Sequence, residues 1–224
     1  MSLNLFDKII YINLEKRKDR NKSILNELKL KDVDESRVFR LKARIDEFNG
    51  ARAAVNSHID ALNYAIEKKF EKVLILEDDV SFYSDKDFFN KTIKDFLENF
   101  ENNWDVFLVG AQLSLCEKTL YSDYVRVKIA QHAHAYAVNK KYLNVLRNCF
   151  IDAYNSMLQD LLFIQSISKN TDQAWKALQI KDKWYMPKIN LAIQNDKYSD
   201  IEKCEKIRTY DSNVEAVKLC EDLN

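Results

Sequence analysis

Short apolar runs alternate with helical patterns through the first half of the chain. Residues 8–14, 73–76 and 104–110 are apolar and rich in branched side chains, which is typical of strands buried on both faces. Between them, apolar residues recur at helical spacing in residues 24–30 and 55–70, as they do on the inner face of a helix that packs on a core. This alternation predicts an α/β fold with a mostly parallel sheet and helices on both faces.

The pattern after residue 110 is less regular. Residues 124–129 and 132–138 alternate as antiparallel or edge strands do, whereas residues 112–122 lack periodicity and are expected to form a loop over the sheet. No linker or repeat divides the chain, so the second half is interpreted as an α+β extension of one domain. The other expected elements are a strand at 37–42, helices at 82–100, 139–146, 158–164 and 214–219, a helix capped by Asn170 or Thr171, and extended pieces at 184–187 and 189–193.

The strand at residues 73–76 runs directly into three carboxylates, Glu77, Asp78 and Asp79. Adjacent carboxylates repel each other and resist desolvation, so a cation beside them would relieve both costs. Their oxygens suit Mg²⁺ or Mn²⁺, which in turn bind phosphate. Residues i and i+2 of an extended chain share a side, so Glu77 and Asp79 form the expected ligand pair, while Asp78 points away or holds the turn. The alternative is an acidic, solvated turn.

Composition narrows the classes of partner. Lys and Arg number 35, as do Asp and Glu, and this balance gives no support for a nucleic-acid-binding protein. With two glycines and one proline, a glycine-rich phosphate loop is excluded, so a nucleotide would have to be held by another device, such as a metal ion. The four scattered cysteines favour reduced thiols. No apolar stretch is long enough to span a membrane and no signal peptide is evident, so we expect a cytoplasmic protein, with peripheral membrane contact left open.

Several motifs occur in a fixed order along the chain. They are the strand and basic loop of residues 10–20, Gly50 followed by Ser57 and His58, residues 74–80, residues 104–110, the strand with His134 and Tyr136, and then Asp172, Pro187, Gln194 and residues 199–201. This ordered set resembles glycosyltransferase family 25, which contains lipopolysaccharide-type β-galactosyltransferases and relatives that modify collagen hydroxylysine. One departure is that Gly50 is followed by Ala51 and Arg52, where the family usually continues with Glu and then Gly-Cys.

The resemblance implies a GT-A fold and a UDP-sugar donor, UDP-galactose or UDP-glucose. It implies inverting transfer of the hexose to a hydroxyl of a glycan or hydroxylysine acceptor, with Mn²⁺ or Mg²⁺, as in lipopolysaccharide biosynthesis. Residues 1–110 would then be the nucleotide-sugar-binding half and residues 111–224 the acceptor-side half. The acceptor, the linkage and the oligomeric state are left open.

The resemblance and the chemistry together nominate site residues. Donor contacts are expected from Asn13, Arg17, Arg20, Ser57, His58, Glu77 and Asp78. Metal ligands are expected from Asp79 and Glu77, with His134 or His132 closing the site, because an i, i+2 pair on one strand face can reach one ion. Asp172 is expected to be the catalytic base and Asp200 a second candidate. The alternatives are that the arginines are solvated, that the histidines pack on the sheet, and that Asp172 only places charge at a helix start.

Two other functions remain possible at this stage. The chain could be a catalytically inactive glycosyltransferase-like module that binds glycans or serves in an assembly. It could also be a nucleotidyltransferase, although those enzymes usually carry a glycine-rich loop after the first strand, and residues 14–17 lack the glycines.

Overall fold

The computed structural model describes residues 2–159, 171–195, 198–199 and 204–205. Its main sheet consists of β1 (Lys8–Asn13), β2 (Val38–Lys42), β3 (Lys72–Glu77), β5 (Val106–Lys118), β6 (Tyr124–Asn139) and β7 (Trp184–Pro187). Two small ladders pair β4 (Val80–Phe82) with β8 (Ala192–Gln194) and β9 (Tyr198–Ser199) with β10 (Cys204–Glu205).

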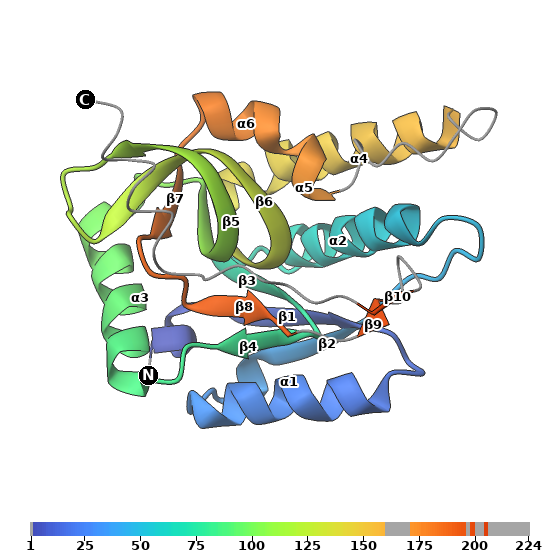
Figure 1. Cartoon of the computed structure of the whole chain (residues 1–224), viewed down its shortest axis with the longest axis horizontal. Helices are drawn as coiled ribbons and strands as arrows, with labels where there is room; N and C mark the ends of the chain where they lie inside the picture. The colour runs from blue at the N-terminus through green and yellow to red at the C-terminus, as the bar shows by residue number, and fades with distance from the viewer. Residues whose placement is uncertain (1, 160–170, 196–197, 200–203, 206–224) are drawn as a thin grey trace.

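The main sheet has six strands in the order β2-β1-β3-β6-β5-β7 (Figure 1). Neighbouring strands are parallel at β1–β2, β1–β3 and β5–β7, and antiparallel wherever β6 takes part. Within the described part of the chain, β6 is therefore the one strand of this sheet that runs against the others. The predicted α/β fold with a mostly parallel sheet is confirmed, as a mixed sheet with one reversed strand.

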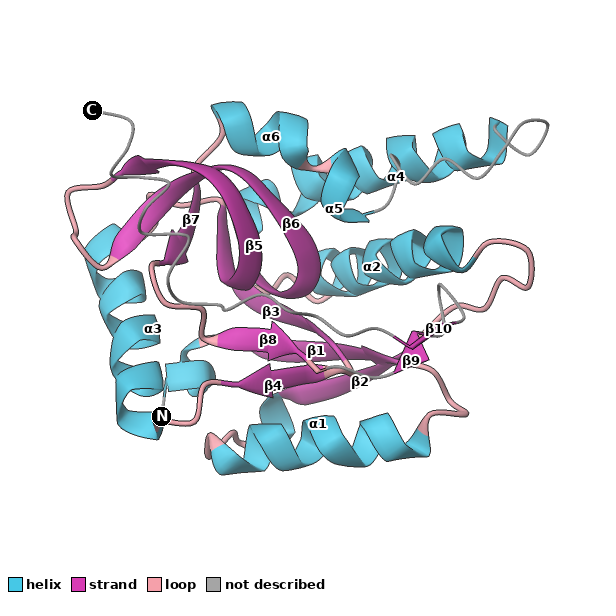
Figure 2. Ribbon diagram, viewed as in Figure 1, coloured by secondary structure: helices cyan, strands magenta, loops and turns pink. Residues whose placement is uncertain are grey.

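Helices cover both faces of the sheet (Figure 2). On one side lie α2, α4, α5 and α6, and on the other lie α1 and α3, each with its apolar residues turned toward the strands. The helices are α1 (Lys18–Leu30), α2 (Gly50–Glu67), α3 (Lys86–Phe100), α4 (Leu143–Gln159), α5 (Thr171–Ala174) and α6 (Lys176–Lys181), with 3₁₀ turns η1 (Ser2–Leu5), η2 (Glu35–Arg37) and η3 (Lys140–Tyr142).

The sheet separates two apolar layers because successive side chains on a strand point to opposite faces. In the layer beneath α3, Phe96 stacks on Phe107 with ring centroids 3.9 Å apart. In the layer beneath α2 and α4, the buried Tyr136 packs edge-on against Trp175 at 5.4 Å. Both layers are dense in aromatic side chains, which bury the most apolar area per residue.

The strand β8 lies against β5 at Gly110. A Cβ atom at Gly110 would meet the Ala192 carbonyl oxygen at 1.8 Å, and neither glycine of the chain has a positive φ. Gly110 is therefore required for space and not for backbone conformation. His134 Nε2 also lies 3.1 Å from the Ala192 carbonyl oxygen. Gly110 and His134 together therefore fix the position of β8.

The loop expected at residues 112–122 is wrong for most of its length. β5 continues to Lys118, and residues 112–118 pair antiparallel with residues 125–131 of β6. The exposed Gln112 and the buried Leu113 do alternate, but the register shifts after Leu113 and again after Leu115. These irregularities interrupt the period-two signal, which is why the strand looked aperiodic in the sequence.

A second correction concerns the histidines of β6. Between two pairings of β5 with β6, Gly110↔Ala135 and Gln112↔Gln131, β6 contains more residues than β5, which is a β-bulge. His132 lies in it with φ 73. Ala133 consequently joins the apolar layer of Tyr136, whereas Ala135 and Ala137 join the opposite layer. The expected alternation of His132, His134 and Tyr136 against the three alanines is therefore broken.

The helix expected from residue 82 begins at Lys86, because Val80–Phe82 pairs with β8. Cys116 is disulfide-bonded, which contradicts the expectation of reduced thiols for that residue, while Cys149 is free. Among the described helices, none is long and apolar enough to cross a membrane. The helix expected at residues 158–164 starts within α4, which extends to Gln159, and the rest of it lies outside the described residues, as do the helix expected at 214–219 and the cap at Asn170.

Candidate functional site

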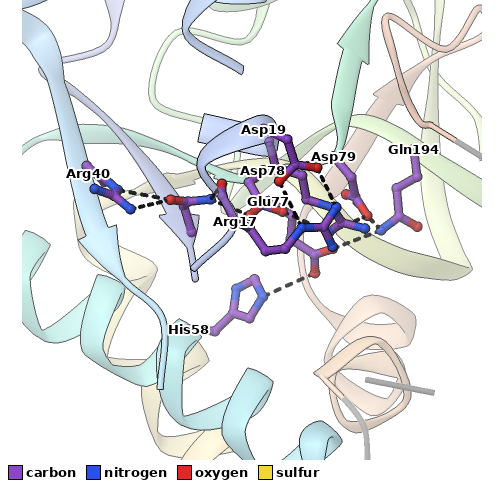
Figure 3. Close-up of polar contacts among 10 residues, drawn as sticks. Arg17, Asp19, Arg40, His58, Glu77, Asp78, Asp79 and Gln194 are labelled. Atoms are coloured by element: carbon purple, nitrogen blue, oxygen red, sulfur yellow. Dashed lines mark hydrogen bonds and ion pairs between the residues drawn. The ribbon is translucent and has the colours of Figure 1, made fainter. Parts of the chain in front are cut away.

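The carboxyl ends of three neighbouring parallel strands meet at one edge of the sheet. β2, β1 and β3 end at Lys42, Asn13 and Glu77, and the acidic turn of residues 78–79 follows directly. Ligands of open α/β sheets bind outside the carboxyl ends of the strands. Figure 3 shows the polar side chains that gather there.

Arg20 from α1 lies against the acidic turn. Its Nη1 donates a hydrogen bond to Asp78 Oδ1 at 2.9 Å and lies 3.4 Å from Asp79 Oδ2. All three side chains are at most 10% exposed, so this is a buried ion pair with two acceptors. Burial raises the pKa of Asp78, and the charge of Arg20 opposes that effect. The guanidinium thus supplies part of the positive charge that the sequence led us to expect from a metal ion.

Asn13 joins the acidic turn to the neighbouring strand. Its Nδ2 donates to Asp78 Oδ2 at 2.6 Å and to the Arg17 carbonyl at 3.2 Å. Its Oδ1 accepts from both Nε and Nη2 of Arg40 on β2. Asp78 is bonded on both oxygens, by Asn13 and by Arg20, which are contacts that hold the turn, and its expected contact with the donor stays a prediction.

Gln194 on β8 bridges the other two carboxylates. Its Nε2 lies 2.8 Å from Glu77 Oε2 and 3.4 Å from Asp79 Oδ1, and dashed lines in Figure 3 mark both contacts. Glu77 and Asp79 therefore converge on one point, in agreement with the expectation that they act on the same side. The Asn195 amide also donates to the Asp79 carbonyl at 2.8 Å, which ties β8 to the turn.

A buried histidine approaches Glu77 from α2. His58 Nε2 lies 3.4 Å from Glu77 Oε1, and His58 Nδ1 lies 2.8 Å from the hydroxyl of Tyr136 on β6. His58 and Tyr136 are at most 1% exposed, whereas the Glu77 side chain is 26% exposed. Glu77 is thus the solvent-facing end of a buried polar chain.

Ser57 holds the loop of residues 43–49 and does not face the acidic turn. Its Oγ accepts from the Arg44 amide and donates to the Ala53 carbonyl, both at 2.8 Å. The loop starts beside the site, since the Ala43 amide donates to the Asn13 carbonyl at 3.0 Å. The contacts of Ser57 are therefore those of a residue that positions this loop.

The same loop presents two apolar side chains to solvent. Asp46 accepts from the amides of Phe48 and Asn49 at 3.0 Å and forms an ion pair with Arg52, so the loop is tightly braced. Phe48 is nevertheless 82% exposed and Ile45 69% exposed. Arg52, the departure from the family pattern, is used to brace this loop.

The other residues expected at the site from the sequence are Arg17, Asp172, Asp200 and the two histidines of β6. Arg17, whose side chain is 17% exposed, forms an ion pair with the exposed Asp19 at 2.8 Å, and Asp172 Oδ2 accepts from the His132 amide at 3.1 Å. Within the described residues, no three His, Cys, Asp or Glu side chains form a group that could hold a metal ion. A histidine ligand therefore stays a prediction, as does the role of Asp172 as base. Asp200 lies outside the described residues.

Three residues of the site were not assigned a role from the sequence. Gln194 and Tyr136 appeared only as members of the ordered motif set, and Arg40 only as a strand residue. Their partners lie far away in the chain: 117 residues separate Gln194 from Glu77, and 78 separate Tyr136 from His58. Tyr136 gave a local signal, a polar group inside an apolar strand, whereas Arg40 lies on an alternating strand and Gln194 gave none beyond the motif order.

Comparisons with known proteins show likeness of fold only. No family model matches the sequence, and no curated protein matches it either. Among solved structures, A197 from STIV matches with 12% identity, a TM-score of 0.48, and coverage of 91% of this chain and 94% of that one.

Two further solved structures are enzymes by their names. A mannose-1-phosphate geranyltransferase from Thermus thermophilus matches with 10% identity, a TM-score of 0.45, and coverage of 80% of this chain and 72% of that one. A glycosyltransferase involved in the glycosylation of the major capsid of PBCV-1 matches with 12% identity, a TM-score of 0.41, and coverage of 80% and 92%. Similarities of this size assign no family, substrate or activity to the chain.

Proposed function

We propose that this chain is a glycosyltransferase that moves a hexose, galactose or glucose, from a UDP-sugar to a hydroxyl of a glycan or hydroxylysine acceptor, with inversion. The observation that carries the proposal is the hydrogen-bonded network at the carboxyl edge, from Arg40 through Asn13 and the acidic turn to Gln194. An edge of this kind is where α/β sheets bind nucleotides. Residues 1–110 would bind the donor, and residues 111–224 would face the acceptor.

Arg17 is the residue best placed to meet the donor diphosphate. It lies in the loop between β1 and α1, and its present partner, the carboxylate of Asp19, is 61% exposed. Because the Asp19 carboxylate is largely exposed, a diphosphate that reaches this loop would compete with it for the Arg17 guanidinium. Arg20, in contrast, is committed to the acidic turn, and its role is to hold Asp78 and Asp79 in place.

The donor set at this edge fits a divalent cation. Glu77 and Asp79 converge on the Nε2 of Gln194, so a point between two carboxylates already accommodates a positively polarised group. Mg²⁺ is usually held by one or two carboxylates together with substrate phosphates and waters, so no further protein ligand is required. Glu77 and Asp79 would hold the ion, which would neutralise charge on the leaving diphosphate.

Inverting transfer also needs a base for the acceptor hydroxyl. Asp172 is our candidate, with Asp200 as the second. One oxygen of Asp172 accepts from the His132 amide, which would fix the orientation of the carboxylate at the bulge of β6. Replacement of Asp172 by Asn should abolish transfer to an acceptor while leaving binding of UDP unchanged.

Thermal unfolding with and without ligands tests the proposal. UDP with Mn²⁺ at 100 times its dissociation constant should stabilise the protein by about 2.7 kcal/mol, which raises the Tm by roughly 5–10 °C for a chain of this size. Asp79→Asn should lose this shift. Asp87→Asn, a change of the same charge at an exposed position of α3, should retain it. A wild-type protein whose Tm does not respond to UDP and Mn²⁺ together would refute the proposal.

An inactive, glycan-binding module is the second candidate. The observation that favours it is Arg20, which already offsets the charge of the acidic turn and so makes a cation less necessary. Hydrolysis of UDP-sugars separates the two candidates. An active enzyme should hydrolyse UDP-galactose or UDP-glucose slowly, and Asp79→Asn should suppress that activity, whereas an inactive module should hydrolyse neither.

A further inference from the structure

Behind Glu77, two buried polar groups continue the site into the interior. The His58 ring lies between the Glu77 carboxylate, 3.4 Å from Nε2, and the Tyr136 hydroxyl, 2.8 Å from Nδ1. The three residues come from β3, α2 and β6, so they hold together three elements of the fold. Figure 3 shows His58 reaching Glu77 from the side opposite the rest of the network.

The chemistry of the three groups fixes where the protons lie. An ionised carboxylate can only accept a hydrogen bond, so the 3.4 Å contact with Glu77 favours a proton on the His58 nitrogen that faces it. In a neutral imidazole the other nitrogen is then an acceptor. Tyr136 can donate to it, because burial raises the pKa of this phenol well above its ordinary value and the hydroxyl keeps its proton.

We propose that Tyr136 locks His58 in the tautomer protonated at Nε2, and that His58 thereby positions Glu77 at the mouth of the site. Tyr136 and His58 are positioning residues in this scheme, since neither reaches the solvent-facing edge. The tautomer is a property of the folded chain alone. Its consequence for sugar transfer rests on the proposed function, in which Glu77 contacts the cation or the donor.

The burial of the pair argues that its polarity has a use. Tyr136 packs against Trp175 and His58 against Phe150, surroundings in which a phenylalanine would fit without a hydrogen-bonding requirement. Burying a hydroxyl and an imidazole costs free energy unless both are paired. Carboxylates that bind metal ions are commonly oriented by hydrogen bonds from residues behind them, and the pair of His58 and Tyr136 ends at the Glu77 carboxylate.

Nitrogen NMR of the imidazole rings tests the tautomer directly. The protein has three histidines, and the signals of His58 are those that disappear in His58→Gln. At neutral pH we expect Nδ1 to show the chemical shift of a bare nitrogen and Nε2 that of a protonated one. A bare Nε2, or protons on both nitrogens, would overturn the proposal.

Tyr136→Phe tests the lock itself, because it removes one oxygen atom and keeps the ring. Without the donor, the two His58 nitrogens should move toward averaged shifts as both tautomers become populated. Unchanged shifts would show that Tyr136 does not select the tautomer. Tyr124→Phe is the matched control, since Tyr124 is equally buried and donates its hydroxyl to the Thr92 carbonyl on the side of α3, and it should leave His58 unaffected.

Kinetics then connect the lock to the site. Loss of such a supporting hydrogen bond typically costs about 10–100-fold in activity or metal affinity, and we expect this loss in Tyr136→Phe but not in Tyr124→Phe. Hydrolysis equal to that of the wild type would overturn the role of Tyr136 in positioning Glu77. If no variant, including the wild type, binds UDP, the proposed function fails while the NMR result on the tautomer stands.

Discussion

Gly110→Ala is the substitution whose effect can be worked out most directly from the structure. The added Cβ atom would lie 1.8 Å from the Ala192 carbonyl oxygen and 2.7 Å from its carbon. Both are backbone atoms, so no side-chain rotation can relieve the contact. The strand β8 must therefore move away from β5, and Gln194 at its end must leave Glu77 and Asp79.

The cost has two parts. Overpacking a well-packed interior costs about 1–3 kcal/mol. Displacement of β8 adds the loss of the bond between His134 and Ala192 and part of the β4–β8 ladder, at about 0.5–1.5 kcal/mol for each hydrogen bond. A total of about 3–5 kcal/mol is a large share of the stability of a domain and corresponds to roughly 6–20 °C in Tm.

Urea unfolding followed by circular dichroism measures this cost. The transition midpoint of Gly110→Ala should fall well below that of the wild type with a similar slope. Gly50→Ala is the control: Gly50 opens α2 with a negative φ, so alanine there should be neutral or slightly stabilising. An unchanged midpoint in Gly110→Ala would show that β8 does not lie against β5 as described.

Two further variants probe the edge of the sheet. Arg20→Met leaves the buried Asp78 and Asp79 without their guanidinium. We expect the free energy of unfolding in urea to fall by about 3–5 kcal/mol. An unchanged midpoint would contradict a buried ion pair. Phe48→Ala should change the unfolding free energy by no more than about 0.5 kcal/mol, because the ring is 82% exposed. If the ring stacks on the ligand, the same variant should bind UDP-sugar more weakly in calorimetry. Equal affinity would exclude that contact.

The order of strands and helices was predictable because each depends on local periodicity. β1 and β3 were located from apolar runs to within one residue, and the direction of the strands followed from the helices between them. The helical spacing at residues 55–70 located α2, which begins earlier, at Gly50, and ends at Glu67. The C-terminal part of β5 was missed because two register shifts break its alternation. A bulge is set by how two distant strands fit together, and no local pattern encodes it.

The site was predictable in location and less so in its contacts. A strand that ends in Glu77, Asp78 and Asp79 must place them at the carboxyl edge, whichever residues surround them. That Asp78 would be held by Arg20 and Asn13 required knowledge of how α1 packs on the sheet. His134 likewise was expected to bind a metal ion, but its contact with the Ala192 carbonyl arises from the crossing of β8, which the sequence does not reveal.

The charge at the edge bears on how a nucleotide could bind there. Asp78 and Asp79 share the buried guanidinium of Arg20, and Glu77 lies beside Asp79 at the Gln194 amide, so carboxylates are concentrated at this edge. Burial raises the pKa of Asp78. A diphosphate would add further negative charge, and like charges at short distance in a partly desolvated site repel strongly. Uridine carries no such charge. Binding of UDP should therefore depend on a divalent cation far more steeply than binding of uridine, and an equal dependence of the two would mean that the phosphates do not approach this turn.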